Sequence, residues 1–419
     1  MLMTDDLSSA FPGISTIEVD YAGRQAELTL HDGRTVMFPM EHYDVSPILS
    51  SRLDITAKTL AMNIRAIGEV VVEIAVATSD DEPRTIVYLD QLHWISLAKA
   101  MTGKSMPQEE KSAALQLTSL VDAGNIILPL SGAHATEMAK AGGKWRRDLA
   151  TVMLRYSRGW QMLSPLSIRA AELRRMFGLK TGKSHSGLPT RSEVFTLEPR
   201  ALWADTPAEA WLPRIGLPSA LQDTLRRITW VQSLYAVLAE EAPSESKQGR
   251  DLAQQWAQSH YELALHMRGN SRAQLHKRSL TRLRFLTDMQ LDLANAAAAS
   301  GMTAEQFYEW LQSDAEHDLT ALPYLGRMRE VIHHRLSNSQ DKWEANDLND
   351  LLFLSCAAGY ADLVVSEKKF GGYLQRVNRQ LGSPSPIVAN LSSAFKLEVL
   401  ARFSAEVAHS SSPTTPDLP

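Results

Sequence analysis

Cysteine is almost absent from this chain of 419 residues, and so are long apolar runs. The single Cys356 excludes an internal disulfide and any zinc site built from several cysteines. Apolar stretches such as 126–130 are far too short to span a bilayer, and the first residues show neither the basic start nor the apolar run of a signal peptide. We therefore expect a protein of the reducing cytoplasm that has no membrane partner.

No sign of charge dominates the chain, whose net charge is −5. Its distribution is uneven: residues 1–90 carry 15 acidic and 6 basic side chains, whereas residues 141–200 carry 12 basic and 4 acidic ones. A second basic cluster occupies residues 268–284. Such asymmetry points weakly to a polyanionic partner, but solvated helix faces explain it better when charge is the only criterion.

Residues 14–78 alternate apolar and polar side chains and contain an Asp-Gly turn signal at 32–33, which is typical of β-strands joined by hairpins. The pattern predicts a small β-rich N-terminal domain, of α+β type, over residues 1–78. A polar segment at 78–83 follows as a linker. Because the domain is acidic, we expect it to contact a partner protein or the basic part of this chain rather than RNA.

Beyond the linker, the pattern predicts an α/β fold with a parallel sheet flanked by helices. Short buried strands are expected at 85–89, 125–130, 361–366 and 387–388, and helices at 91–100, 108–121, 131–140, 347–359 (with Asn346 as its N-cap) and 392–407. The fold is predicted in two parts, 79–144 and 342–408. Residues 145–341 form a large, mostly helical insertion, and residues 409–419 a disordered tail.

Carboxylates fall at equivalent positions along this predicted sheet. Asp90 follows the first strand, Glu137 lies on the helix after the second, Asp347 and Asp350 open the helix before the third, and Glu367 follows the third. Ligands bind beyond the carboxyl ends of such strands, so we expect Asp90, Glu137, Asp347 and Asp350 to converge on one pocket. Carboxylates without His or Cys suit Mg²⁺ or Mn²⁺ and the hydrolysis of phosphodiesters. Each acid alone has an ordinary interpretation as a helix cap or a surface residue.

Three blocks of the sequence resemble PIN-like nuclease domains: 87–98 (VYLDQLHWISLA), 127–137 and 346–368. They cover roughly a tenth of the chain. The resemblance implies a PIN-like fold and a metal-dependent ribonuclease, often a bacterial toxin or an RNA-processing enzyme, and a toxin, stress or phage-defence role follows from it alone. It implies Asp90, Glu137 and Asp350 as metal ligands, with Asp347 instead of Asp350 or beside it. Where the family usually has Asp after the last strand, this chain has Glu367, which is expected as a further metal ligand; its longer side chain leaves open binding through water or no binding at all.

Basic side chains are the candidates for RNA binding. His134, one turn before Glu137, is predicted to hold a phosphate or shuttle a proton, and a core or capping role is at least as plausible. Arg147, Arg155 and Arg158 are predicted to share a helix face that contacts the RNA backbone. The alternative is that these arginines pair with the acidic N-terminal domain. The pair at 333–334 is interpreted as structural or exposed.

The leading interpretation is a metal-dependent endoribonuclease whose catalytic residues are Asp90, Glu137, Asp347 and Asp350. One alternative is a catalytically weak PIN-like module that binds RNA or protein, which the replacement at Glu367 favours. The other is a DNA-directed nuclease or a phosphatase that uses the same acids, because a sequence does not show the groove contacts that distinguish RNA by its 2′-hydroxyl.

Overall fold

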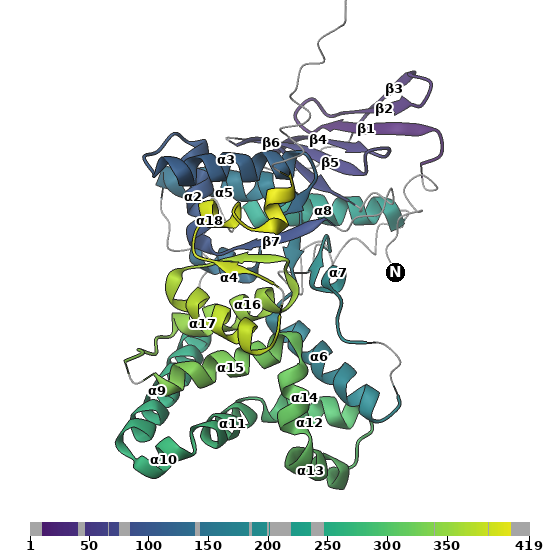
Figure 1. Ribbon diagram of the computed structural model, residues 1–419. Helices are drawn as coiled ribbons and strands as arrows, with labels where there is room; N and C mark the ends of the chain where they lie inside the picture. The colour runs from purple at the N-terminus through teal and green to yellow at the C-terminus, as the bar shows by residue number, and fades with distance from the viewer. Residues whose placement is uncertain are drawn as a thin grey trace, which may run out of the picture.

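The computed structural model describes residues 11–40, 47–65, 67–74, 84–138, 143–183, 187–198, 201, 219–235, 247–338, 340–383 and 385–403. The protein is a mixed α/β structure with one antiparallel sheet, one parallel sheet and many helices (Figure 1). No helix among the described residues has both the length and the apolar character needed to cross a bilayer. The predicted tail at 409–419 lies outside the described residues.

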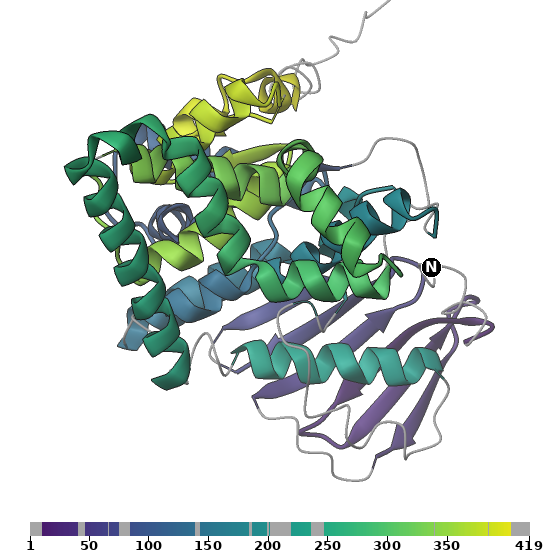
Figure 2. The ribbon, with the colours of Figure 1, turned by 90° about the horizontal axis from the view of Figure 1, so that it is seen from below.

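The N-terminal segment forms a six-stranded antiparallel sheet in the order β3-β2-β1-β4-β5-β6. Gly33, in the expected Asp-Gly turn, has a φ of 84°, which a residue without Cβ adopts freely. Helix α8 (Ser219–Tyr235) lies across one face of the sheet (Figure 2) and joins its apolar core. The strands are β1 (Ile14–Asp20), β2 (Gln25–Leu30), β3 (Thr35–Pro39), β4 (Ile48–Asp54), β5 (Thr59–Ile64) and β6 (Gly68–Glu73).

The parallel sheet has the order β12-β11-β7-β8, and all its strand pairs are parallel, as predicted. Its strands are β7 (Thr85–Leu89), β8 (Ile126–Ile127), β11 (Leu363–Val365) and β12 (Ile387–Val388). Along β7, Val87 and Leu89 enter one apolar core while Ile86 and Tyr88 enter the other. Because both faces are buried, the strand reads as a continuous apolar run in the sequence.

Helices cover both faces of this sheet (Figure 1). One layer contains α2 (Gln91–Met101), α3 (Gln108–Asp122), α5 (Gly143–Ser157) and the short α18 (Leu391–Ala394). The other contains α6 (Pro165–Lys180), α15 (Pro323–Ser337), α16 (Asn346–Tyr360) and α17 (Lys368–Gln380). Helix α4 (Gly132–Met138) follows β8. The chain therefore builds a three-layer unit from segments that are far apart in sequence.

The long segment between α5 and α15 is mostly helical in its described residues, with one small two-stranded sheet. That sheet continues the parallel one through a parallel bridge between Leu130 and Gln161. The remaining elements are β9 (Gln161–Met162), α7 (Arg191–Val194), β10 (Phe195–Thr196), α9 (Lys247–Gly269), α10 (Ser271–Leu275), α11 (Lys277–Asp288), α12 (Gln290–Ala299), α13 (Ala304–Ser313) and α14 (Ala315–Ala321).

Two sequence-based boundaries are wrong. The single helix expected over 392–407 is interrupted: α18 ends at Ala394, and a turn separates it from the helical residues 398–403. Asn346 is not the N-cap of α16, because the helix begins at Asn346 itself and Ala345, in the cap position, already has a helical backbone. Helix ends are decided by local hydrogen bonds that periodicity does not reveal.

Helices α15 and α16 approach so closely that a glycine separates their backbones. An added Cβ at Gly359, on α16, would lie 2.7 Å from the carbonyl oxygen of Pro323. Real Cβ atoms do not come this close to backbone oxygen, so the packing of the helix that carries Asp347 and Asp350 requires glycine here.

We predict that Gly359→Ala destabilises the protein by about 1–3 kcal/mol, because two backbones must separate to admit a methyl group. Gly372→Ala is the matched control: Gly372 lies within α17, and its added Cβ would meet nothing within 4 Å. That variant should gain about 0.5–1 kcal/mol from helix propensity. Urea unfolding of both variants tests the packing, and equal stabilities would contradict it.

Candidate active site

Asp90 lies where two neighbouring strands end. It directly follows β7, and its backbone N–H donates to the carbonyl of Val365 at the end of β11 (2.9 Å). One carboxylate oxygen accepts from the N–H of Gln91 (2.7 Å) and so caps α2. The other accepts from the N–H of Glu367 at 3.3 Å. The carboxylate is therefore held at the carboxyl edge of the parallel sheet, as the sequence predicts.

Glu137 and Asp350 reach the same place from α4 and α16. They line a small pocket with Asp90, between the end of β7 and the facing sides of α4 and α16. The remaining described residues around it are uncharged side chains, among them Asn349 and Phe353, and none of them is Lys or Arg. Three of the four predicted acids therefore converge on this pocket, and its described lining contains no Lys or Arg.

The pocket disfavours negative charge. Burial raises the pKa of Asp350 to about 7, and the nearby carboxylates of Asp90, Glu367, Glu137 and Asp347 raise it further. Burial also raises the pKa of Asp90, against the two backbone hydrogen bonds that lower it. The carboxylates thus repel one another in a site with little water to screen them.

Glu367 lies near the pocket but does not line it. It precedes α17 directly after β11, and its charge contributes to the raised pKa values of both Asp90 and Asp350. The structure therefore places this predicted metal ligand near the other carboxylates. Its backbone N–H contacts the site directly by donating to the carboxylate of Asp90.

Asp347 was expected in the pocket, but its carboxylate binds elsewhere. One oxygen accepts from the fully buried Arg335 (2.8 Å) and from the N–H of Glu344 (2.6 Å), and the other lies 3.5 Å from the ammonium group of Lys369. A carboxylate held by a buried guanidinium fixes the start of α16. Asp347 is not among the described residues that line the pocket.

Two kinds of role were predicted for His134, contact with phosphate or a proton and a core or capping role, and its 1% exposure agrees with the second. Its Nδ1 accepts from the N–H of Ser131 (3.0 Å), so Nε2 carries the proton and donates to the carbonyl of Leu89 (2.8 Å). Burial lowers its pKa to about 4, so it is neutral near pH 7. His134 therefore fixes the end of β7 to the start of α4, and both its nitrogens are used there.

The three arginines do not share one helix face. Arg147 and Arg155 are exposed on α5, and no described acidic group pairs with either. Arg158 lies beyond the end of α5 with a φ of 49°, and its guanidinium is 3.3 Å from the carboxylate of Glu73 on β6. The alternative prediction, pairing with the acidic N-terminal domain, thus holds for Arg158.

Glu73 joins the two sheets at this point. Besides Arg158, it binds Arg84 (2.6 Å) and accepts from the indole N–H of Trp160 (3.2 Å). The N-terminal domain is therefore attached through a largely buried carboxylate to residues on both sides of the parallel sheet.

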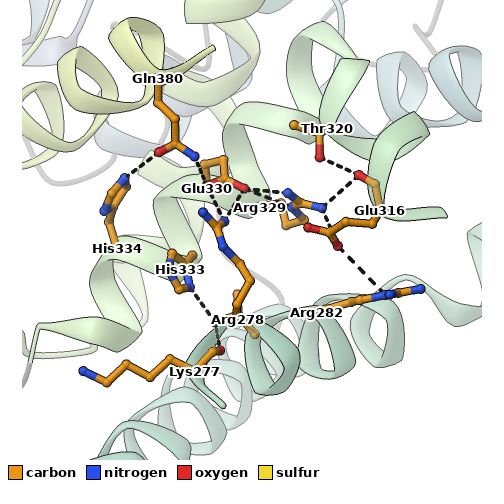
Figure 3. A network of polar contacts seen from close by, with 11 residues as sticks. Lys277, Arg278, Arg282, Glu316, Thr320, Arg329, Glu330, His333, His334 and Gln380 are labelled. Carbon is orange, nitrogen blue, oxygen red and sulfur yellow. Dashed lines mark hydrogen bonds and ion pairs between the residues drawn. The ribbon is translucent and has the colours of Figure 1, made fainter. Parts of the chain in front are cut away.

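Much of the second basic cluster is neutralised inside the helical segment. Arg278 donates to the fully buried Glu330 (2.6 and 2.7 Å), which also accepts from Arg329 and Gln380 (Figure 3). Burial raises the pKa of Glu330, but the guanidinium contacts outweigh burial and lower it to about 2. Arg284 likewise pairs with Asp288 (2.6 Å). Arg278 thus joins α11 to α15, whereas Arg284 pairs within α11, and both pairs explain part of the charge asymmetry.

His333 and His334 belong to the same network, as their interpretation as structural residues predicts. His333 shares a hydrogen bond with Thr281 (3.1 Å), and His334 is 3.3 Å from the side-chain oxygen of Gln380 (Figure 3).

The chemistry of the pocket fits a hard divalent cation, since it offers carboxylate and amide oxygens. The spacing is less favourable. In the part of the chain that the structure describes, no three His, Cys, Asp or Glu side chains lie close enough together to hold a metal ion. The acids line one pocket and repel one another electrostatically, but they are not close enough together to form a set of metal ligands.

Two pocket residues were missed in the sequence: Gln91, which directly follows Asp90, and Asn349, which directly precedes Asp350. Their position next to the predicted acids was the available signal. Comparisons of the chain with protein families, with curated proteins and with solved structures give no match.

The raised pKa of Asp350 predicts a pH-dependent stability. Asp350 binds its proton near pH 7 when folded and near its ordinary value of 3.8 when unfolded, so the folded protein holds more protons between these values. The free energy of unfolding should therefore fall as pH rises through this window.

Asp350→Asn removes this penalty and should stabilise the metal-free protein at pH 8 by on the order of 1–3 kcal/mol, with no gain below pH 4. Asp122→Asn, at an exposed position on α3, is the control for a lost surface charge. Thermal melts across this pH range measure both. An Asp350→Asn protein that melts like the wild type at pH 8 would show that the carboxylates do not repel.

Proposed function

We propose that this protein is a metal-dependent endonuclease that acts on RNA and is built on a PIN-like α/β domain. The observation that carries the proposal is the convergence of Asp90, Glu137 and Asp350 on one pocket at the carboxyl edge of a parallel sheet, with no described Lys or Arg in its lining. Acids that repel one another inside a protein are stabilised by a cation. The preference for RNA rests on the resemblance of the sequence to PIN-like nucleases.

A bound Mg²⁺ or Mn²⁺ would supply charge neutralisation and an acidified water for phosphodiester hydrolysis. Asp90, Glu137 and Asp350 would hold it, with Glu367 as a nearby fourth carboxylate. Two backbone N–H groups orient the carboxylate oxygens of Asp90. Asp350, whose pKa is about 7, would exchange its proton for the cation near neutral pH.

A second candidate function is a catalytically weak module that binds RNA or protein. The absence of a closed ligand set among the described His, Cys, Asp and Glu residues favours it, and so does Glu367 in place of Asp. Cleavage of RNA in the presence of Mn²⁺ would separate the two functions, because only the nuclease requires the carboxylates to close around the ion. The same assay with DNA of matched sequence addresses the third alternative.

We predict that Asp90→Asn lowers cleavage of labelled RNA by at least about 100-fold at saturating Mn²⁺, because it removes one ligand charge. Asn can still cap α2 through its one oxygen, but its amide nitrogen cannot accept from the N–H of Glu367, so the melting temperature of the variant is measured beside its cleavage. Wild-type cleavage should stop in EDTA. Asp122→Asn makes the same charge change on the exposed surface and should cleave normally. Undiminished cleavage by Asp90→Asn would place the active site elsewhere.

Within the predicted RNA-binding surface, the exposed face of α5 carries arginines that pair with no described acidic group. Replacing Arg147 and Arg155 together by Ala should weaken binding to all RNAs alike and flatten the log–log salt dependence by about two units. Arg158→Ala is the matched control. It should leave the salt slope unchanged and lower the melting temperature, because it leaves Glu73 with one partner fewer. Equal salt slopes in the wild type and the double variant would exclude the α5 face.

A further inference from the structure

The contacts of the Gln91 side chain do not explain why a polar residue is buried at this position. It is the first residue of α2, it is 8% exposed, and it lines the pocket beside Asp90, Glu137 and Asp350. Its amide nitrogen makes one weak contact, 3.6 Å from the sulfur of Met138. Its Oε1 is buried and accepts no hydrogen bond. Among the described residues that line the pocket, it is the one with such an orphaned side-chain atom.

An unpaired buried carbonyl oxygen destabilises the folded protein, and an apolar side chain of similar shape would avoid this destabilisation. None of the three neighbouring acids is a hydrogen-bond partner of Oε1, and a carboxylate that is ionised accepts hydrogen bonds and donates none. The Oε1 atom therefore lacks a donor or a cation. Hard divalent cations take carboxylate and amide oxygens together.

We propose that Gln91 is a further ligand of the cation in this pocket, supplying its Oε1 as a neutral oxygen beside the carboxylates of Asp90, Glu137 and Asp350. This inference rests on the proposed metal-dependent function. A neutral ligand adds a donor without adding to the repulsion among the acids. Because Gln91 and Asp90 are adjacent at the end of β7, one rigid strand end would present two donors to the same ion.

Titration calorimetry of the full-length protein with MnCl₂ tests the proposal. Gln91→Met keeps the volume and the contact with Met138 but removes the oxygen, and it should weaken Mn²⁺ binding by about tenfold or more. Gln161→Met is the matched control. Gln161 is also a fully buried glutamine with an unpaired Oε1, and it does not line the pocket. It should bind Mn²⁺ as the wild type does.

Wild-type affinity in Gln91→Met would overturn the assignment of Gln91 and leave the proposed function standing. A wild type that shows no saturable Mn²⁺ binding would overturn both. The two failures are therefore distinguishable in the same experiment.

Gln91→Glu provides a second test if Gln91→Met does not fold. A fourth carboxylate in the pocket should lower the melting temperature of the metal-free protein, and Mn²⁺ should then raise it by more than it raises that of the wild type. If Mn²⁺ raises both melting temperatures equally, Gln91 does not face the ion.

Discussion

The parallel pairing of β7 with β11 is the contact on which the candidate site depends. It aligns Leu89 with Val365, so Asp90 and Glu367 leave the sheet side by side although about 280 residues separate them along the chain. The backbone of each strand end then binds the other, through the N–H groups of Asp90 and Glu367. Carboxylates are thereby concentrated at an edge where burial makes their charges costly.

Contacts around the pocket hold the carboxylates together despite their mutual repulsion. Helix α16 brings Asp350 to the pocket, and the buried pair of Arg335 and Asp347 fixes the start of that helix. Neutral His134 ties the end of β7 to α4, which carries Glu137. A ligand that neutralises the carboxylates relieves their mutual repulsion. Its binding therefore stabilises the folded protein, which is how metal sites couple binding to stability.

The sequence predicted the parallel sheet and, of the four acids expected to converge, the three that do, for a general reason. Strands buried on both faces appear as continuous apolar runs, and residues after parallel strands meet at one edge. Asp90, Glu137 and Asp350 follow from this logic without knowledge of any side-chain partner. The β-rich character of the N-terminal segment was also predicted, from alternation and the turn at Gly33, but the strand order of its six-stranded sheet was not.

What could not be predicted depends on partners that are distant in sequence or on local backbone geometry. The residues next to Asp347 in the sequence do not indicate that a buried arginine pairs with it. Those next to His134 do not indicate that both its ring nitrogens form hydrogen bonds inside the protein. Arg158 continues the helical spacing of α5, yet its positive φ turns it toward Glu73. Gln91 resembles an ordinary helix residue until its environment shows that its oxygen has no partner.

The most direct measurement is an anomalous difference map from crystals soaked in Mn²⁺. The account predicts one strong peak in the pocket, within about 2.5 Å of oxygens of Asp90, Glu137 and Asp350, with these side chains drawn together around it. A map with no peak at saturating Mn²⁺, or with peaks only at other sites, would contradict the claim that this acidic edge is a metal centre.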